Sequence, residues 1–179
     1  MVKSWLTVKE MTLMAIWIAL ALVLDRFIVF QQPQGGSINI SMVALMLIVM
    51  RFGLWKSLFA NALVYGFIAN LWDGYGLNTY PLDYFLALAS LSTFYFMIRF
   101  IKSDQLIVRQ AALWAGFYIA VSLRLFFHVI SGVVLYEVDW VGSWTYNVSY
   151  LFPSYVLSAI VLSALIEIKS IQSILFSNQ

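Results

Sequence analysis

Six long apolar runs, separated by short polar stretches, divide the chain. The runs are Met11 to Phe30, Ile38 to Met50, Leu54 to Trp72, Pro81 to Ile101, Leu106 to Tyr136 and Tyr146 to Ile168. Most reach the roughly 20 apolar residues that a bilayer span requires. A segment in lipid must satisfy its backbone hydrogen bonds internally, which favours helices. The pattern therefore predicts an all-α integral membrane protein with six transmembrane helices.

The second run is short for a span that rises about 1.5 Å per residue. We expect it to cross either with help from the loop around Gly35 and Gly36 or because neighbouring helices shield it from lipid. The first run lacks a small-residue cleavage site and is interpreted as a retained span. No linker or low-complexity stretch interrupts the chain, so residues 1–179 are expected to form one membrane-embedded domain.

Composition agrees with this interpretation and excludes several classes of function. The chain is 63% apolar and 10% charged, with a mean hydropathy of +0.91, whereas a soluble domain is roughly half apolar and a quarter charged. It has no GxxxxGK[ST], HExxH or GxGxxG motif and no cysteine, so we expect no enzyme, catalytic residue, metal or cofactor. The net charge of +2 gives no indication of nucleic-acid binding. Energy for any transport would come from a partner or a gradient.

The basic residues predict the orientation, because Lys and Arg collect at the cytoplasmic ends of spans. The loops Gln31 to Asn39, Asp73 to Tyr80 and Glu137 to Thr145 contain neither residue type. If both termini are cytoplasmic, eight of the ten basic residues lie on the cytoplasmic side: Lys3, Lys9, Arg51, Lys56, Arg99, Lys102, Arg109 and Lys169. We therefore expect both termini to be cytoplasmic.

The outer ends of the spans carry an excess of acids. The acids are Asp25, Asp73, Asp83, Glu137 and Asp139, and the bases at that level are Arg26 and Arg124. This excess favours the approach of a cation, although acidic outer loops also complement the positive-inside bias without binding anything. We expect Arg124 to pair with Asp25 or Asp83, which lie at a similar depth.

Two ionisable residues within the spans are candidates for a binding site, because such groups are costly in lipid and usually face a cavity or a partner. Asp83 lies in the first turn of the fourth span beside Tyr84, where it serves either a site or the helix N-terminus. His128, the only histidine, lies one turn after Arg124 and on the same face. A lone histidine is a poor zinc site. We interpret His128 as a hydrogen-bonding residue of a cavity, with a structural histidine as the alternative.

Aromatic side chains gather at the same outer level. They are Trp72, Tyr75, Tyr80, Tyr84, Tyr136, Trp140, Trp144, Tyr146 and Tyr150. An interfacial belt accounts for such residues singly, but a desolvated aromatic wall contributes about 2 kcal/mol to the binding of an organic cation. Asn147 adds a paired donor and acceptor that suits an aminopyrimidine edge. Gly35 and Gly36 in the first outer loop form either a flexible lid over such a pocket or a plain connection.

Small residues indicate where helices approach closely. Ala15 and Ala19 lie four residues apart in the first span and would allow close contact with a partner subunit or within the bundle. In the fifth span, Ala112, Gly116 and Ala120 have the same spacing, and there we expect internal packing.

Together, these motifs resemble those of the thiamine-specific S components, the ThiT-like group, of energy-coupling factor (ECF) vitamin transporters. The resemblance rests on Ala15 to Asp25, on Gly35-Gly36-Ser37-Ile38 with Ser41-Met42, on Leu82-Asp83-Tyr84 with Leu86-Ala87, and on His128-Val129-Ile130-Ser131-Gly132 with Tyr146-Asn147, Tyr150 and Pro153. It implies a substrate-binding domain of six helices in a bacterial plasma membrane. Such a domain captures extracellular thiamine and works with a transmembrane coupling subunit and two ATPase subunits.

By the pattern of that family, Asp83 would face the thiazolium ring, and His128 and Asn147 would hydrogen-bond the ligand. The nearby Trp and Tyr rings would stack on it, and Ala15 and Ala19 would contact the coupling subunit. Two alternatives stay open. One is an S component for another flat vitamin or precursor, such as riboflavin or a hydroxymethylpyrimidine, whose lack of charge would leave Asp83 without a cationic partner. The other is a small proton-coupled carrier that uses Asp83, Arg124 and His128 as a relay.

Overall fold

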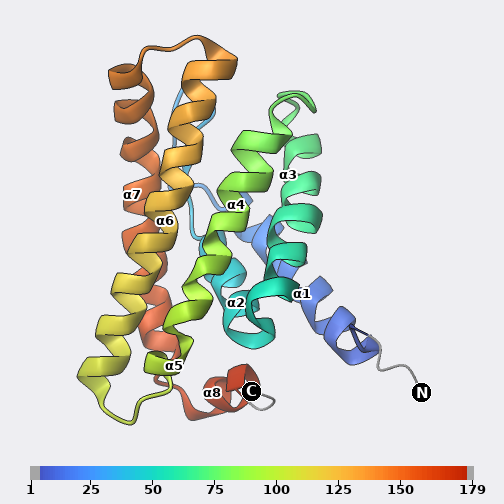
Figure 1. The fold of residues 1–179 in the computed structure, drawn as a ribbon, viewed down its shortest axis with the longest axis vertical. Coiled ribbons are helices and arrows are strands. Elements are labelled where there is room, and N and C mark those ends of the chain that lie inside the picture. Colours follow the sequence, from blue (N-terminus) through green and yellow to red (C-terminus); the bar gives the residue numbers. More distant parts are fainter. Residues whose placement is uncertain (1–4, 177–179) are drawn as a thin grey trace.

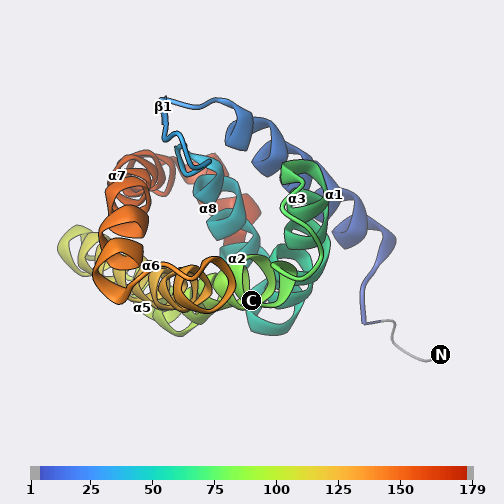
Figure 2. The same ribbon diagram turned by 90° about the horizontal axis from the view of Figure 1, so that it is seen from above.

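Helices make up most of residues 5–176, which the computed structural model describes (Figures 1 and 2). In chain order the elements are α1 (Val8–Arg26), β1 (Phe30–Gln31), β2 (Ser37–Ile38), α2 (Ser41–Leu58), η1 (Phe59–Tyr65), α3 (Gly66–Asp73), η2 (Tyr80–Leu86), α4 (Ala87–Ala89), η3 (Ser90–Met97), α5 (Ile98–Ile101), α6 (Leu106–Tyr136), α7 (Trp140–Leu165) and α8 (Lys169–Phe176). The stretches 59–73 and 80–101 are each continuous, although they include wider π-helical turns and tighter 3₁₀ turns. The six helices that the sequence predicts are α1, the part of α2 before Gly53, the stretch 54–73, the stretch 80–101, α6 and α7.

The second helix lies in the middle of the bundle, which explains how a short apolar run is accommodated. Every residue of 41–50 is buried, and α2 packs against α1, η3, α7 and α8. Neighbouring helices therefore shield this helix from lipid, which is one of the two arrangements that we expect from the sequence. Gly53, with φ 75° and ψ −174°, interrupts the helical backbone after Phe52, so the predicted boundary between Met50 and Leu54 is confirmed.

Within residues 5–176, four stretches are long and apolar enough to cross a membrane. They are Ser41–Asp73, Tyr80–Ile101, Leu106–Tyr136 and Trp140–Leu165. The first of them contains the break at Gly53 and so includes two helices. α1 is 19 residues long and carries charged side chains near both of its ends, with an uncharged stretch between them.

Five predicted boundaries lie three or more residues from those in the structure, and local hydrogen bonding explains two of them. α1 begins at Val8 rather than Met11, and α2 begins at Ser41 rather than Ile38. The first helix ends at Arg26, because the chain turns into the antiparallel β1–β2 hairpin. The last long helix begins at Trp140, six residues earlier than predicted, because the Asp139 carboxylate accepts hydrogen bonds from the backbone N–H groups of Val141 and Gly142 at 3.0 Å each. Such a cap satisfies donors that a helix start leaves unpaired. The same helix ends at Leu165, before the separate α8.

The two stripes of small residues differ in their surroundings. Ala112, Gly116 and Ala120 are buried, and a Cβ added to Gly116 would lie 2.6 Å from the Met97 side chain. The fifth-span stripe is therefore an internal packing site, as predicted. Ala15 and Ala19 are exposed on the outer face of α1, so the first-span stripe is free to meet a partner.

The two ends of the described chain lie toward the same end of the molecule. Figure 1 shows the start of α1 and the whole of α8 toward the end opposite the connection between α6 and α7. An even number of crossings requires this arrangement. At the opposite end, the hairpin and the connections at 74–79 and 137–139 surround the site described next.

Candidate functional site

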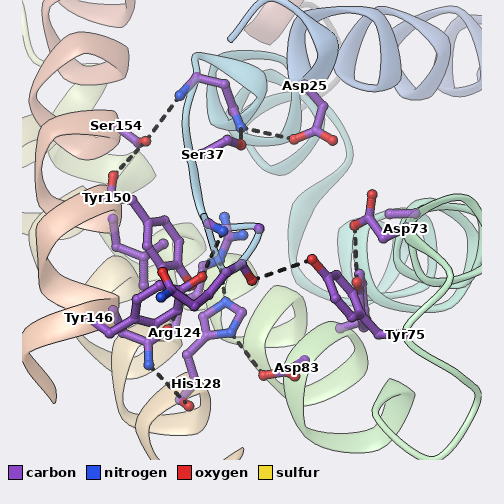
Figure 3. A pocket seen from close by; sticks show the side chains of 18 of the residues that line it. Asp25, Ser37, Asp73, Tyr75, Asp83, Arg124, His128, Tyr146, Tyr150 and Ser154 are labelled. Atoms are coloured by element: carbon purple, nitrogen blue, oxygen red, sulfur yellow. Dashed lines mark hydrogen bonds and ion pairs between the residues drawn. The ribbon is translucent and has the colours of Figure 1, made fainter. Parts of the chain in front are cut away.

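A cavity of about 720 Å³ opens between the β1–β2 hairpin, α1, α3, η2, α6 and α7. Its walls carry five charged side chains: Asp25, Asp73, Asp83, Arg26 and Arg124. The remaining lining is largely aromatic and amide or hydroxyl side chains (Figure 3). A cavity of this size with a few convergent polar groups is typical of a site for a small organic molecule.

Asp83, His128 and Arg124 form a chain of contacts along one wall. Asp83 Oδ1 lies 3.1 Å from His128 Nδ1, and the Arg124 Nε donates to His128 Nε2 at 3.2 Å. The second carboxylate oxygen of Asp83 accepts a longer hydrogen bond, 3.4 Å, from the Tyr136 hydroxyl. The side chains of His128 and Asp83 are 11% and 15% exposed. η2 and α6 thus place a largely desolvated carboxylate at the wall of the cavity.

The expectation that Arg124 pairs with an acid is wrong. In the described part of the chain Arg124 makes no ion pair within 4.0 Å, and its hydrogen bond goes to His128 instead. The reason is helical spacing. Arg124 and His128 lie four residues apart, so their side chains share one face of α6, and the imidazole lies between the guanidinium and Asp83.

A second polar group lies on the opposite wall. Arg26 donates to Asp73 at 2.7 Å and lies 3.5 Å from Asp25. The Tyr84 hydroxyl donates to the other oxygen of Asp73 at 3.0 Å. The Arg26 guanidinium also covers the Trp72 ring, with 5.2 Å from Cζ to the ring centroid. The two acids of this wall therefore share one arginine.

Asn147 has partners at both ends of its side-chain amide. Its Nδ2 donates to the Ser143 carbonyl at 2.8 Å, and its Oδ1 accepts from the Tyr150 hydroxyl at 2.7 Å. A longer contact of 3.4 Å reaches the His128 carbonyl. Asn147 is 5% exposed, so it supports the wall formed by α6 and α7 while contributing to the lining.

The loop between the first two helices folds over the cavity as the β1–β2 hairpin. Gly35 has φ 102°, a conformation that a residue with a side chain rarely adopts. The Gly36 N–H donates to the Tyr146 hydroxyl at 2.7 Å, and the Gln32 amide donates to Ser149. Opposite these, the Tyr75 hydroxyl donates to a carbonyl of the same loop. The loop is thus held from two sides of the cavity.

The structure brings seven of the ten predicted ligand-binding residues to the cavity. These are Trp72, Asp83, Tyr84, His128, Tyr146, Asn147 and Tyr150. The other three do not line it. Tyr80 donates its hydroxyl to the Ala62 carbonyl at 3.1 Å, whereas Trp140 and Trp144 are 60% and 54% exposed.

Several lining residues were not predicted. They include Asn39 and Tyr65, together with Asp25, Arg26 and Asp73, for which the sequence indicated only an acidic outer level. Tyr75 and Tyr136, which the sequence placed among the outer aromatic side chains, line the cavity as well. Asn39 donates to Asp25 at 3.0 Å and accepts from Ser41 at the start of α2. The Gly-Gly-Ser-Ile-Asn-Ile-Ser run just before α2 could have revealed Asn39, since a polar residue before a fully apolar helix is typical of a helix start. Among residues 5–176 no group of three or more acidic or histidine side chains is placed to hold a metal ion.

Comparisons with known proteins agree with this architecture. The family model described as thiamine transporter protein (Thia_YuaJ) matches residues 11–174. The thiamine transporter ThiT of Bacillus subtilis (strain 168) is 30% identical over 167 residues, which cover 84% of this chain and 86% of that protein. A solved structure of ThiT from Listeria monocytogenes has a TM-score of 0.77 at 21% identity, covering 89% of this chain and 93% of that one. That structure supports the same fold.

Proposed function

The chain belongs to the thiamine transporter protein family, and from this premise we propose that it captures extracellular thiamine as the substrate-binding subunit, the S component, of an ATP-driven ECF-type transporter. The family is one of multi-pass membrane transporters and not of enzymes. The single observation that supports thiamine as the ligand is the carboxylate of Asp83. It is 15% exposed, it lies in a cavity of about 720 Å³, and it contacts His128.

Thiamine joins a cationic thiazolium to a neutral aminopyrimidine, and the cavity offers a partner for each. Asp83 would face the thiazolium, because opposite charges attract strongly where water is excluded. The rings of Tyr146, Tyr150 and Trp72 would stack on the flat heterocycles. Asn147 would bind the pyrimidine by exchanging the Tyr150 hydroxyl for a donor of the ligand.

The hairpin would act as the lid. Closure over the ligand needs the Gly36 to Tyr146 hydrogen bond and the contact of the same loop with Tyr75. These contacts join the loop to α7 and to the connection after α3, so opening would separate two walls of the cavity. Lids of this kind sequester a ligand from water.

Partners would supply the energy, since the chain has no nucleotide-binding motif. A transmembrane coupling subunit would dock on the exposed Ala15 and Ala19 of α1, where small side chains let helices approach closely. Two ATPase subunits would bind that coupling subunit. The lipid bilayer surrounds the remaining outer faces of the helices.

Tryptophan fluorescence during titration with thiamine tests the ligand. Trp72 is the one tryptophan among the lining residues, so it should report binding. We expect saturable quenching at submicromolar thiamine, and no comparable effect of riboflavin or the isolated hydroxymethylpyrimidine. Trp72→Phe should remove most of the signal, while calorimetry still detects binding. A folded protein that responds to riboflavin and not to thiamine would contradict the proposed ligand.

Uptake tests the dependence on partners. Liposomes that contain this chain alone should accumulate no thiamine under a proton or sodium gradient, whereas cells that also express the coupling and ATPase subunits should do so. Gradient-driven accumulation by the chain alone would indicate a carrier and contradict the S-component assignment.

Single cysteines test the proposed orientation, with both termini cytoplasmic in a bacterial plasma membrane. The chain has no cysteine of its own, so each introduced thiol is unique. A membrane-impermeant maleimide should label Asn78→Cys in intact cells and Lys169→Cys only after permeabilisation. The reverse pattern would place the cavity on the inner side.

A further inference from the structure

The two ring nitrogens of His128 each have one partner. Arg124 Nε donates to Nε2 at 3.2 Å, and Asp83 Oδ1 lies 3.1 Å from Nδ1. Tyr150 of α7 packs edge to face against the ring, with 6.4 Å between the ring centroids and 72° between the ring planes. The imidazole is 11% exposed, so its partners, rather than water, determine which nitrogen carries a proton (Figure 3).

Arginine restricts the protonation of this ring. A guanidinium donates hydrogen bonds and accepts none, so Nε2 must be the unprotonated acceptor. A neutral imidazole of this kind carries its one proton on Nδ1 and directs it to Asp83. An imidazolium would place an N–H of His128 against the N–H of Arg124. We propose that Arg124 is a positioning residue that keeps Nε2 of His128 unprotonated, so that the imidazole stays neutral beside Asp83.

This inference rests on the proposed function and adds the reason why the site attracts a cation. A neutral imidazole donates a hydrogen bond to Asp83 without cancelling its charge. An imidazolium would instead form an ion pair with Asp83 and compete with the thiazolium of the ligand. Arg124 from α6, Asp83 from η2 and the Tyr150 hydroxyl from α7 are the charged or titratable groups that face the ring, and Tyr136 reaches it only through Asp83.

NMR of the single histidine tests the protonation directly. The chain contains one histidine, so ¹⁵N-histidine labelling with a histidine-free affinity tag reports on His128 alone. At about pH 6, below the ordinary imidazole midpoint of about 6.5, the wild type should show a protonated Nδ1 and an unprotonated Nε2. Arg124→Met should show both nitrogens protonated at that pH, and Arg124→Lys, which also only donates, should restore the wild-type spectrum.

The affinity for thiamine at two pH values supplies a second readout. A purely structural role of Arg124 would not make this affinity depend on pH. Wild type and Arg124→Lys should bind about equally well at about pH 8 and at about pH 6. For Arg124→Met, the affinity at the lower pH should be about tenfold weaker than the same variant's affinity at the higher pH, because the imidazolium then neutralises the carboxylate.

Thermal unfolding of each variant separates these effects from loss of the fold. If Arg124→Met does not fold, Arg124→Leu replaces it, because leucine likewise removes every donor to Nε2. An Arg124→Met or Arg124→Leu spectrum identical to that of the wild type, or a wild type with both nitrogens protonated at about pH 6, would overturn the proposal. Failure of the wild type to bind thiamine would contradict the proposed function alone, since the NMR measurement needs no ligand.

Discussion

Replacement of Asp83 by asparagine removes the charge of the carboxylate while it preserves its shape. The Asn oxygen can still accept from His128 Nδ1, which lies 3.1 Å from Asp83 Oδ1, so the fold should persist. Two opposite charges about 4 Å apart attract by about 4 kcal/mol at the effective dielectric near a protein surface. Desolvation offsets part of this, and a hydrogen bond to a charged group contributes about 1.5–3 kcal/mol net. At about 1.4 kcal/mol per tenfold, Asp83→Asn should weaken thiamine binding about 10- to 150-fold.

Calorimetric titration of the purified protein measures this loss, and two comparisons assign it to the charge. The neutral hydroxymethylpyrimidine should bind Asp83→Asn within about threefold of the wild type, since it lacks the cation that the carboxylate attracts. Asp139→Asn is the matched control. It removes another outer carboxylate that does not line the cavity, and asparagine still caps α7. Equal weakening of both ligands by Asp83→Asn, or a similar loss in Asp139→Asn, would refute the assignment of Asp83 as the cation-binding residue.

Three further predictions concern the hairpin over the cavity, the ion pair between Arg109 and Glu167, and the exposed small residues of α1. Gly36→Ala should weaken thiamine binding about 5- to 150-fold in the same titration, because the added Cβ would lie 2.6 Å from an aromatic ring of α7 and such overpacking costs about 1–3 kcal/mol. The hydrogen bond from Arg109 holds the pKa of Glu167 below its ordinary value. Glu167→Gln should therefore lower the free energy of unfolding by up to about 1 kcal/mol at neutral pH. This effect should disappear as the pH falls through that lowered pKa. Ala15→Leu combined with Ala19→Leu should leave thiamine binding by the purified protein unchanged but abolish uptake in cells, and uptake at the wild-type rate would exclude this stripe as the docking surface.

Hydropathy predicts the helices of this protein well because lipid requires internally bonded, apolar segments. It predicts their ends poorly, because ends depend on individual hydrogen bonds. The Asp139 cap begins α7 at Trp140, within a stretch whose glycine, serine and threonine resemble a loop. Once that start is known, helical geometry also explains one misplaced aromatic residue. Trp144 and Tyr146 are two residues apart, about 200° around the helix, so when Tyr146 faces the cavity Trp144 faces outward.

The sequence also indicates which charged groups reach the outer level without indicating how they pair. Depth along the helices places Arg124 near Asp25 and Asp83 alike. Only the packed structure shows His128 between Arg124 and Asp83, and Arg26 between Asp25 and Asp73. Pairing depends on the rotation of each helix about its axis, and an apolar run with a weak amphipathic pattern does not determine that rotation.

These pairings determine which of the three cavity carboxylates attracts a cation. Asp25 and Asp73 both lie against Arg26, at 3.5 Å and 2.7 Å, so their charges are already compensated in part by a residue of the chain. Asp83 contacts His128 and Tyr136, and Arg124 requires the imidazole to be neutral. Within the described residues, Asp83 is thus the cavity carboxylate without a cationic partner in contact. A ligand with one positive charge compensates it, whereas a neutral ligand of the same shape leaves it buried and unpaired, which is costly. Under the proposed function, the cavity would therefore select for charge by the arrangement of its own arginines as much as by the carboxylate itself.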